Sequence, residues 1–354
     1  MNVRIAFAWL YALLLGVSAV PASQSESERL NTDPELEEIE TLFRSAPRGG
    51  RDHRTSGGAS QGDAASELRA AANKAKAVRL KYPQGHSRAA QARRLEAKAL
   101  LNAALMGDSG VTEEAVAIAE EARKDTTLPI GERFELAKLR ELVRSREFIH
   151  DAGQLRSQRE RSAKRLIEEF PNEAGGYEAL LREAENQPEG EKAASLANEI
   201  LASAAPPHVK EAAQTLAERY ALIGQSFREI ASEALGADSP IVAAGGGPTI
   251  IYAWATWSPG AIAFAKQLSQ TAPAGAVLVG VCLDVDVEAA RSAAAATGLP
   301  GQLVFDAQGV EGVLARRLKL TAGMPVYLTD RHGSIKDVAA ERGDIVAKLD
   351  SVIR

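Results

Sequence analysis

Two residues of this chain could serve as nucleophiles, Cys282 and Ser258. Cys282 is the only cysteine, so the chain can form no internal disulfide, and thiol chemistry would need a partner thiol or a second copy. Ser258 lies in the segment YAWATWSPGA, residues 252–261, directly before Pro259. A serine is a hydrolytic nucleophile only when a base lies within hydrogen-bond distance and a third group orients that base. The elements around both residues therefore decide whether either can react.

The region beyond Gly224 alternates short β-rich runs with helical patterns. The runs PTIIYAWA, AVLVGVCLD, GQLVFD and MPVYLTD occupy residues 248–255, 276–284, 301–306 and 324–330. Helical patterns lie between them at residues 260–270, 287–298 and 312–319, and another follows at residues 340–353. Strands that alternate with helices predict a sheet covered by helices on both faces. We therefore expect an α/β domain at residues 222–354.

The segments WATWSPGA, residues 254–261, and GMPVYLTD, residues 323–330, together resemble the thioredoxin family. The resemblance is to the family's secreted TlpA-like branch, which shares the redoxin core. The part of this chain that resembles the branch begins at about Ile223. The first segment corresponds to the family's W-A-T-W-C-x-x-C motif and the second to the part that carries its cis-proline. The resemblance implies a thioredoxin fold that holds an extended polypeptide beside that proline. The residues that would border this peptide are Trp257, Pro259, Met324 and Pro325.

The reactive positions of that motif are altered in this chain. Ser258 stands where the family has its attacking cysteine, and Ala261 stands where it has the resolving cysteine. A serine hydroxyl is far less acidic than a thiol and forms no mixed disulfide, so the resemblance implies that disulfide exchange is lost here. Tyr252 occupies the position of a buried acid that many relatives use for proton transfer. We expect Tyr252 in the core with its hydroxyl bonded.

No hydrolytic, redox or metal chemistry is expected at this site. The fold would place none of the histidines near Ser258, so we expect Ser258 to cap a helix that begins at Pro259. Cys282 lies within a β-rich run, where a cysteine is usually a small buried apolar residue. Asp284 and Asp286 follow that run, where aspartate commonly caps a helix, and two spaced carboxylates are a weak metal signal. We expect no metal, no cofactor and no catalytic residue.

Residues 64–221 carry a helical pattern throughout. Four apolar stripes have most of the helical spacing: Ala75, Val78 and Tyr82; Ala115, Ile118, Ala119 and Ala122; Ala163, Leu166, Ile167 and Phe170; Ala213, Leu216, Ala217 and Tyr220. The prolines of KYPQG, TTLPIG, EFPNEAGG and AAPPH separate the helices. The echo between AKAVRLKYP and AKRLIEEFP resembles degenerate tetratricopeptide repeats. We expect helical hairpins, either as a repeat array that binds protein or as a bundle that supports the α/β domain.

The N-terminus resembles a secretory signal peptide. Arg4 precedes the apolar run Ile5–Val17, and small residues follow near Ala22. We expect cleavage near residue 22, with an uncleaved membrane anchor as the alternative, and a periplasmic or extracellular location. Residues 23–63 are expected to be a flexible linker, in which NTDPELEEIETLF could form a short helix.

Composition excludes one class of partner and leaves two functions open. The net charge of −5 gives no reason to expect nucleic acid, and the local basic run at residues 88–98 falls on a helical pattern. We therefore expect a non-catalytic, extracytoplasmic protein that binds an unidentified protein or peptide. The alternative is an active thiol-disulfide oxidoreductase or antioxidant enzyme, as in the family that the motif resembles.

Overall fold

The computed structural model describes residues 34–45, 61–236, 247–273, 275–320 and 324–339. The expected signal peptide and most of the expected linker lie outside these ranges. The chain divides into two compact units, Met1–Gly176 and Tyr177–Arg354, and each is described by itself. Within the described residues no helix is long and apolar enough to cross a membrane.

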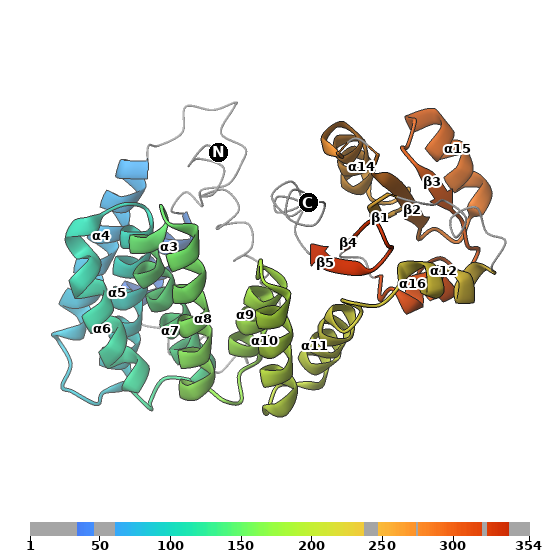
Figure 1. Ribbon diagram of the computed structural model, residues 1–354. Helices are drawn as coiled ribbons and strands as arrows, with labels where there is room; N and C mark the ends of the chain where they lie inside the picture. Colours follow the sequence, from blue (N-terminus) through green and yellow to red (C-terminus); the bar gives the residue numbers. More distant parts are fainter. Residues whose placement is uncertain (1–33, 46–60, 237–246, 274, 321–323, 340–354) are drawn as a thin grey trace. The chain divides into compact units, whose positions relative to one another are not determined.

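The first unit is entirely helical in its described part (Figure 1). Its helices are α3 (Pro34–Ser45), α4 (Gln61–Arg79), α5 (Ser87–Leu105), α6 (Thr112–Lys124), α7 (Ile130–Ser145) and α8 (Ala152–Glu169). Two short 3₁₀ turns, η1 (Ser109–Val111) and η2 (Arg146–Phe148), connect them, and α9 (Ala174–Glu185) spans the division between the units. From α4 onward each helix packs against the next as far as α8.

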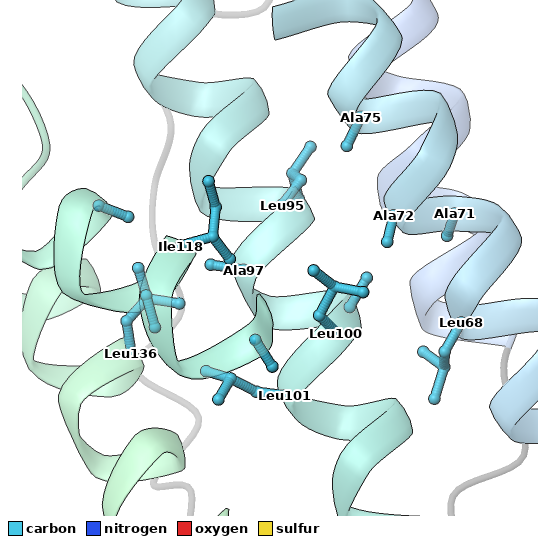
Figure 2. Packing of buried hydrophobic residues seen from close by; sticks show 14 of the residues in the cluster. Leu68, Ala71, Ala72, Ala75, Leu95, Ala97, Leu100, Leu101, Ile118 and Leu136 are labelled. Atoms are coloured by element: carbon cyan, nitrogen blue, oxygen red, sulfur yellow. The ribbon is translucent and has the colours of Figure 1, made fainter. Parts of the chain in front are cut away.

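Small side chains form much of the core of this unit. Figure 2 shows alanines of α4, labelled Ala71, Ala72 and Ala75, beside Leu95 and Leu100 of α5, with Ile118 of α6 and Leu136 of α7 on the other side of α5. An alanine adds little side-chain bulk, so the helices approach closely, and it costs no side-chain entropy when it is buried. The stripe at Ala115, Ile118, Ala119 and Ala122 is buried, as its spacing predicts.

Helix ends in this unit follow their sequence signals. The expected proline breaks all lie between helices, at residues 80–86, 125–129 and 170–173 here and at residues 203–206 in the second unit. Asp151 caps α8 by accepting hydrogen bonds from the backbone N–H groups of Gly153 and Gln154, both at 2.9 Å. The short helix expected within the linker is α3, and its Leu36 and Ile39 are buried in the helical core. This part of residues 23–63 thus belongs to the first unit.

The second unit begins with helices and continues as an α/β sheet. Its helices are α10 (Gly190–Ala202), α11 (Pro207–Tyr220), α12 (Phe227–Leu235), α14 (Pro259–Thr271), α15 (Val287–Thr297) and α16 (Val313–Arg317), with the 3₁₀ turn η3 (Gly309–Glu311). Its strands are β1 (Thr249–Trp254), β2 (Val277–Cys282), β3 (Gln302–Val304), β4 (Val326–Thr329) and β5 (Ile335–Ala339).

The five strands form one mixed sheet in the order β3-β2-β1-β4-β5. Strands β1, β2 and β3 are parallel, whereas β4 is antiparallel to both β1 and β5. In the parallel pair Trp254 lies opposite Cys282, so β1 and β2 end side by side. The carboxyl ends of β1, β2 and β3 therefore share one edge of the sheet, which we call the carboxyl edge.

The division between the units differs from the expected domain boundary at residue 221. Helix α11 groups with the sheet because Gly224 donates a backbone hydrogen bond to Ile335 of β5 at 2.7 Å. Arg219 also donates to the backbone oxygen of Lys319 at 3.4 Å, and Lys319 forms an ion pair with Glu218. These contacts join the end of α11 to the α/β part, and sequence spacing alone does not reveal them.

Candidate functional site

The motif segment lies at the carboxyl edge, where β1 leads into α14. Leu283 donates a backbone hydrogen bond to Trp254 at 2.9 Å, which extends the β1–β2 pairing beyond the strands. The residues that follow, Thr256 and Asp284, are joined through a side chain. The Asp284 carboxylate accepts hydrogen bonds from the backbone N–H and the hydroxyl of Thr256, each at 2.8 Å. Asp284 is itself buried. A carboxylate that accepts two such bonds holds the start of the motif loop in place.

The loop then begins a helix at the position expected. Ser258 is the N-cap residue of α14 and Pro259 its first residue, but the Ser258 side chain makes no capping hydrogen bond. Instead the backbone N–H of Ala261 donates to the Ser258 carbonyl oxygen at 2.9 Å. Trp257 projects from this loop with 54% of its surface exposed, and Pro259 is exposed beside it. The loop therefore presents an indole to solvent at the beginning of a helix.

The positions that correspond to the family's two cysteines hold no thiol, and the chain's one cysteine is buried. Ala261 is buried in α14 and has no reactive group. Cys282 is buried as expected, and its thiol donates to Asp284 at 3.5 Å. Burial raises the pKa of Cys282 to about 12, and the nearby Asp284 carboxylate adds to the rise. At neutral pH Cys282 is a protonated thiol inside the protein, and a thiol in that state is a poor nucleophile.

Tyr252 lies in the core with its hydroxyl bonded, as expected from its place in the motif. Its hydroxyl donates to the backbone oxygen of Pro300 at 2.6 Å, and burial raises its pKa. The ring crosses Gly280, the residue opposite it on β2, where an added Cβ would lie 2.7 Å from the tyrosine ring. The glycine is therefore required by the tyrosine, and the pair fills the space with no group that transfers protons at neutral pH.

The proline segment departs from the expectation in two ways. No peptide bond between described residues is cis, so the bond between Met324 and Pro325 is trans and the expected cis-proline is wrong. The backbone instead turns through Met324, which has φ of 51° in the left-handed region. Met324 is also buried, with 6% of its surface exposed, and Pro325 is buried next to it. Of the four residues expected to border a peptide, Trp257 and Pro259 are the exposed ones.

The other polar residues considered for chemistry have structural contacts. Asp286 caps α15 by accepting a bond from the N–H of Ala289 at 3.0 Å. The histidines with side-chain contacts lie elsewhere: His86 caps α5, His208 contacts Glu178, and His332 contacts Arg331. His53 lies outside the described residues, and among those described Ser258 has no histidine as hydrogen-bond partner. Nor does the described part of the chain hold a cluster of three metal-binding side chains.

Sequence reasoning missed two features of the carboxyl edge. The bond pair between Thr256 and Asp284 depends on the register of β1 and β2, although an aspartate directly after a strand was the available signal. Val285 follows Asp284 and is 71% exposed, which its apolar type does not suggest. Trp254, at the end of β1, packs edge-on against Phe305, with 5.9 Å between the ring centroids.

Comparisons with known proteins do not identify the family or the activity of this chain. No family model matches the chain, and no curated protein matches it. A solved thioredoxin-like protein from Parabacteroides distasonis is 16% identical, with 30% of this chain and 81% of that chain covered and a TM-score of 0.26. The C-terminal domain of a Bacteroides thetaiotaomicron protein named as a thiol-disulfide oxidoreductase is also 16% identical, with 30% and 78% covered and a TM-score of 0.28. At these values neither similarity bears on family or activity.

Proposed function

We propose that residues 222–354 form a thioredoxin-like domain, of the TlpA-like type with a degenerate motif, that binds polypeptide without exchanging disulfides. The order of the chain's own strands supports this, because a mixed sheet with a motif loop between a central strand and a helix is what the resemblance implies. The motif keeps its aromatic and proline residues at that point and lacks both sulfurs.

One observation carries the proposal. The exposed Trp257 stands on a loop that Asp284 holds in place, and the thiol bonded to Asp284, Cys282, is buried rather than exposed beside the indole. An exposed aromatic side chain on a fixed loop offers large contact area at a small entropic cost, which is typical of protein-binding sites. A retained binding loop without a nucleophile fits a protein that holds a chain rather than one that reduces it.

The helical unit is proposed to support this domain or to add a second binding surface, as a tetratricopeptide-like array would. Its consecutive packed helices are compatible with either role. A titration of the separately expressed residues 23–176 with an unfolded polypeptide would decide between the two. Binding would favour a second binding surface, and no binding would favour a supporting role.

The proposed location outside the cytoplasm rests on the N-terminal sequence alone. A fusion of residues 1–30 to alkaline phosphatase, which is active only after export, tests it. Activity of the fusion is the expected result, and an inactive fusion that remains in the cytoplasm would contradict the location.

The binding proposal is tested with a permanently unfolded polypeptide, reduced and carboxymethylated α-lactalbumin, whose thiols are blocked. Residues 23–354 should bind it in a fluorescence titration, and Trp257→Ala should weaken that binding about tenfold, as the loss of a central aromatic contact does. Leu80→Ala is the matched control, since Leu80 is an exposed apolar residue of the first unit. Binding that Trp257→Ala leaves unchanged would contradict the proposed site.

A further inference from the structure

Exposed apolar side chains gather at the carboxyl edge of the sheet. Trp257 follows β1, Val285 follows β2, and Val310 and Val313 follow β3 in η3 and at the start of α16. These four, which we call the edge patch, are half of the eight large apolar residues that are exposed among the described residues. A grouping of this kind at strand ends marks an interaction surface more often than scattered single residues do.

The segments that carry the edge patch are in contact with one another. Thr256, before Trp257, is bonded to Asp284, before Val285. On the other side a Cβ added at Gly309 would lie 3.2 Å from the Val285 side chain and 2.7 Å from the Leu283 oxygen, so η3 packs directly against the segment after β2. The segments that carry the patch therefore lie against one another at the ends of three neighbouring strands.

The charge around the edge patch is negative. Residues 284–291 and 305–317 together contain five carboxylates and three arginines, and one of the arginines, Arg317, is already paired with Glu233. Asp286, Glu288 and Glu311 are exposed, and none of them is in an ion pair with another described residue. Of the arginines, Arg291 stacks on Phe305 at 4.5 Å, and Arg316 lies one turn after Val313. Apolar side chains within an acidic rim are complementary to an apolar segment flanked by Lys or Arg.

We propose that the edge patch binds a polypeptide segment whose large apolar side chains alternate with lysine or arginine. This inference rests on the proposed function and narrows it, because it names the chemistry of the partner. It also places the contact surface toward β2 and β3. The proline segment at Met324 and Pro325 lies on the other side of β1, beside β4, and is buried.

The test uses residues 23–354 and three dye-labelled synthetic peptides in anisotropy titrations. One peptide repeats Leu-Val-Lys, the second has Glu in place of each Lys, and the third keeps Lys but has Ser in place of Leu and Val. The first should bind about tenfold more tightly than either of the others. Equal binding of the Lys and Glu peptides, or of the Leu-Val and Ser peptides, would overturn the proposal.

Two double variants separate the apolar and the charged contributions. Val285→Ser with Val310→Ser should weaken the binding of the Leu-Val-Lys peptide about tenfold. Leu80→Ser is the control and should leave that binding unchanged, because Leu80 has the same 71% exposure as Val285. Glu288→Gln with Glu311→Gln should reduce the preference for Lys over Glu, with Asp286 left unchanged because it caps α15. Glu67→Gln with Glu113→Gln is the matched control, since it removes the same charge from exposed positions of the helical unit.

The outcomes also distinguish this inference from the proposed function. Loss of peptide binding in Trp257→Ala, but not in the double serine variant, would leave the proposed function standing and overturn the edge patch as the wider site. No binding of any peptide or unfolded chain would overturn both. Sedimentation of the wild type as a dimer that the double serine variant abolishes would mean that a second copy occupies the patch, and would also overturn the proposal.

Discussion

Charged side chains are arranged differently in two regions of the molecule. One region is the charge cluster of helices α6, α7 and α8, and the other is the carboxyl edge of the sheet. In the cluster Arg140 of α7 is 1% exposed and its guanidinium contacts three carboxylates, Glu120 at 2.6 Å, Glu141 at 2.9 Å and Glu169 at 3.3 Å. Glu141 is buried as well, and it accepts hydrogen bonds from Ser162 at 2.7 Å and from Arg165. Every charge that this cluster buries is therefore paired.

At the carboxyl edge the arrangement is reversed. Asp286, Glu288 and Glu311 are exposed there and have no cationic partner among the described residues, while the buried Asp284 is held by Thr256 rather than by a cation. Buried charges need partners because an unpaired one costs several kcal/mol, whereas exposed charges cost the fold little. The difference indicates that the cluster joins three helices, while the exposed acids of the edge contribute little to folding and are available for contacts with other molecules.

The largest expected effect is at Arg140. Arg140→Ala removes the buried guanidinium that joins three carboxylates and leaves Glu141 paired only with Arg144 and Arg165, so the free energy of unfolding of the helical unit should fall by about 3 kcal/mol. Urea unfolding followed by circular dichroism measures this. Glu311→Gln at the edge is the contrasting variant and should leave the unfolding free energy unchanged within error. If Arg140→Ala lowers the free energy of unfolding no more than Glu311→Gln does, the two regions do not differ in how much their charges stabilise the fold.

Acid should weaken the same cluster. Burial by itself would raise the pKa of Glu141, but the hydrogen bonds from Arg165 and Ser162 and the charge of Arg140 lower it below its ordinary 4.5. The unfolded chain then binds the proton more readily. The stabilisation is present in full above about pH 4.5 and is lost as the pH falls through the folded pKa.

Circular dichroism at 222 nm during urea unfolding at several pH values between 6 and 2 tests this. The wild type should lose stability below about pH 4.5, and Glu141→Gln should show a smaller loss over the same range. An equal pH dependence in both proteins would show that Glu141 does not carry the effect.

A smaller effect is expected at the buried acid of the carboxyl edge. Asp284→Ala removes the acceptor of both Thr256 bonds, so it should cost about 1–3 kcal/mol and loosen the loop that carries Trp257. Hydrogen exchange at the Thr256 amide should become faster. Asp284→Asn keeps one carbonyl oxygen and should retain part of the protection. If exchange at Thr256 is unchanged in Asp284→Ala, Asp284 does not hold the loop.

The sequence predicts those parts of the fold that depend on local pattern. The β-rich runs at residues 248–255, 276–284 and 324–330 contain β1, β2 and β4, and the expected prolines separate the helices. Strand β5 was not expected, because Lys336 and Asp337 interrupt its apolar pattern at the edge of the sheet. The turn before it depends on Asp330, which accepts bonds from the N–H groups of His332 and Ser334.

The candidate site was predictable in its residues but not in its geometry. Tyr252 and Cys282 are buried and Ser258 begins a helix, as their neighbours in sequence suggest. The bond between Thr256 and Asp284 depends on two strands meeting in register, which no local pattern encodes. The burial of Met324 likewise follows from how β4 packs against β1.

The central claim is that the motif loop keeps its structure and lacks its thiol chemistry. Reduction of insulin by dithiothreitol, followed as turbidity, tests it most directly. Wild-type residues 23–354 should not exceed the uncatalysed rate, and Ser258→Cys with Ala261→Cys should exceed it. The reason is that a cysteine placed at the beginning of α14 would gain the acidity that a helix N-terminus gives to a thiol. A wild-type rate above the background that disappears in Cys282→Ser would contradict the account.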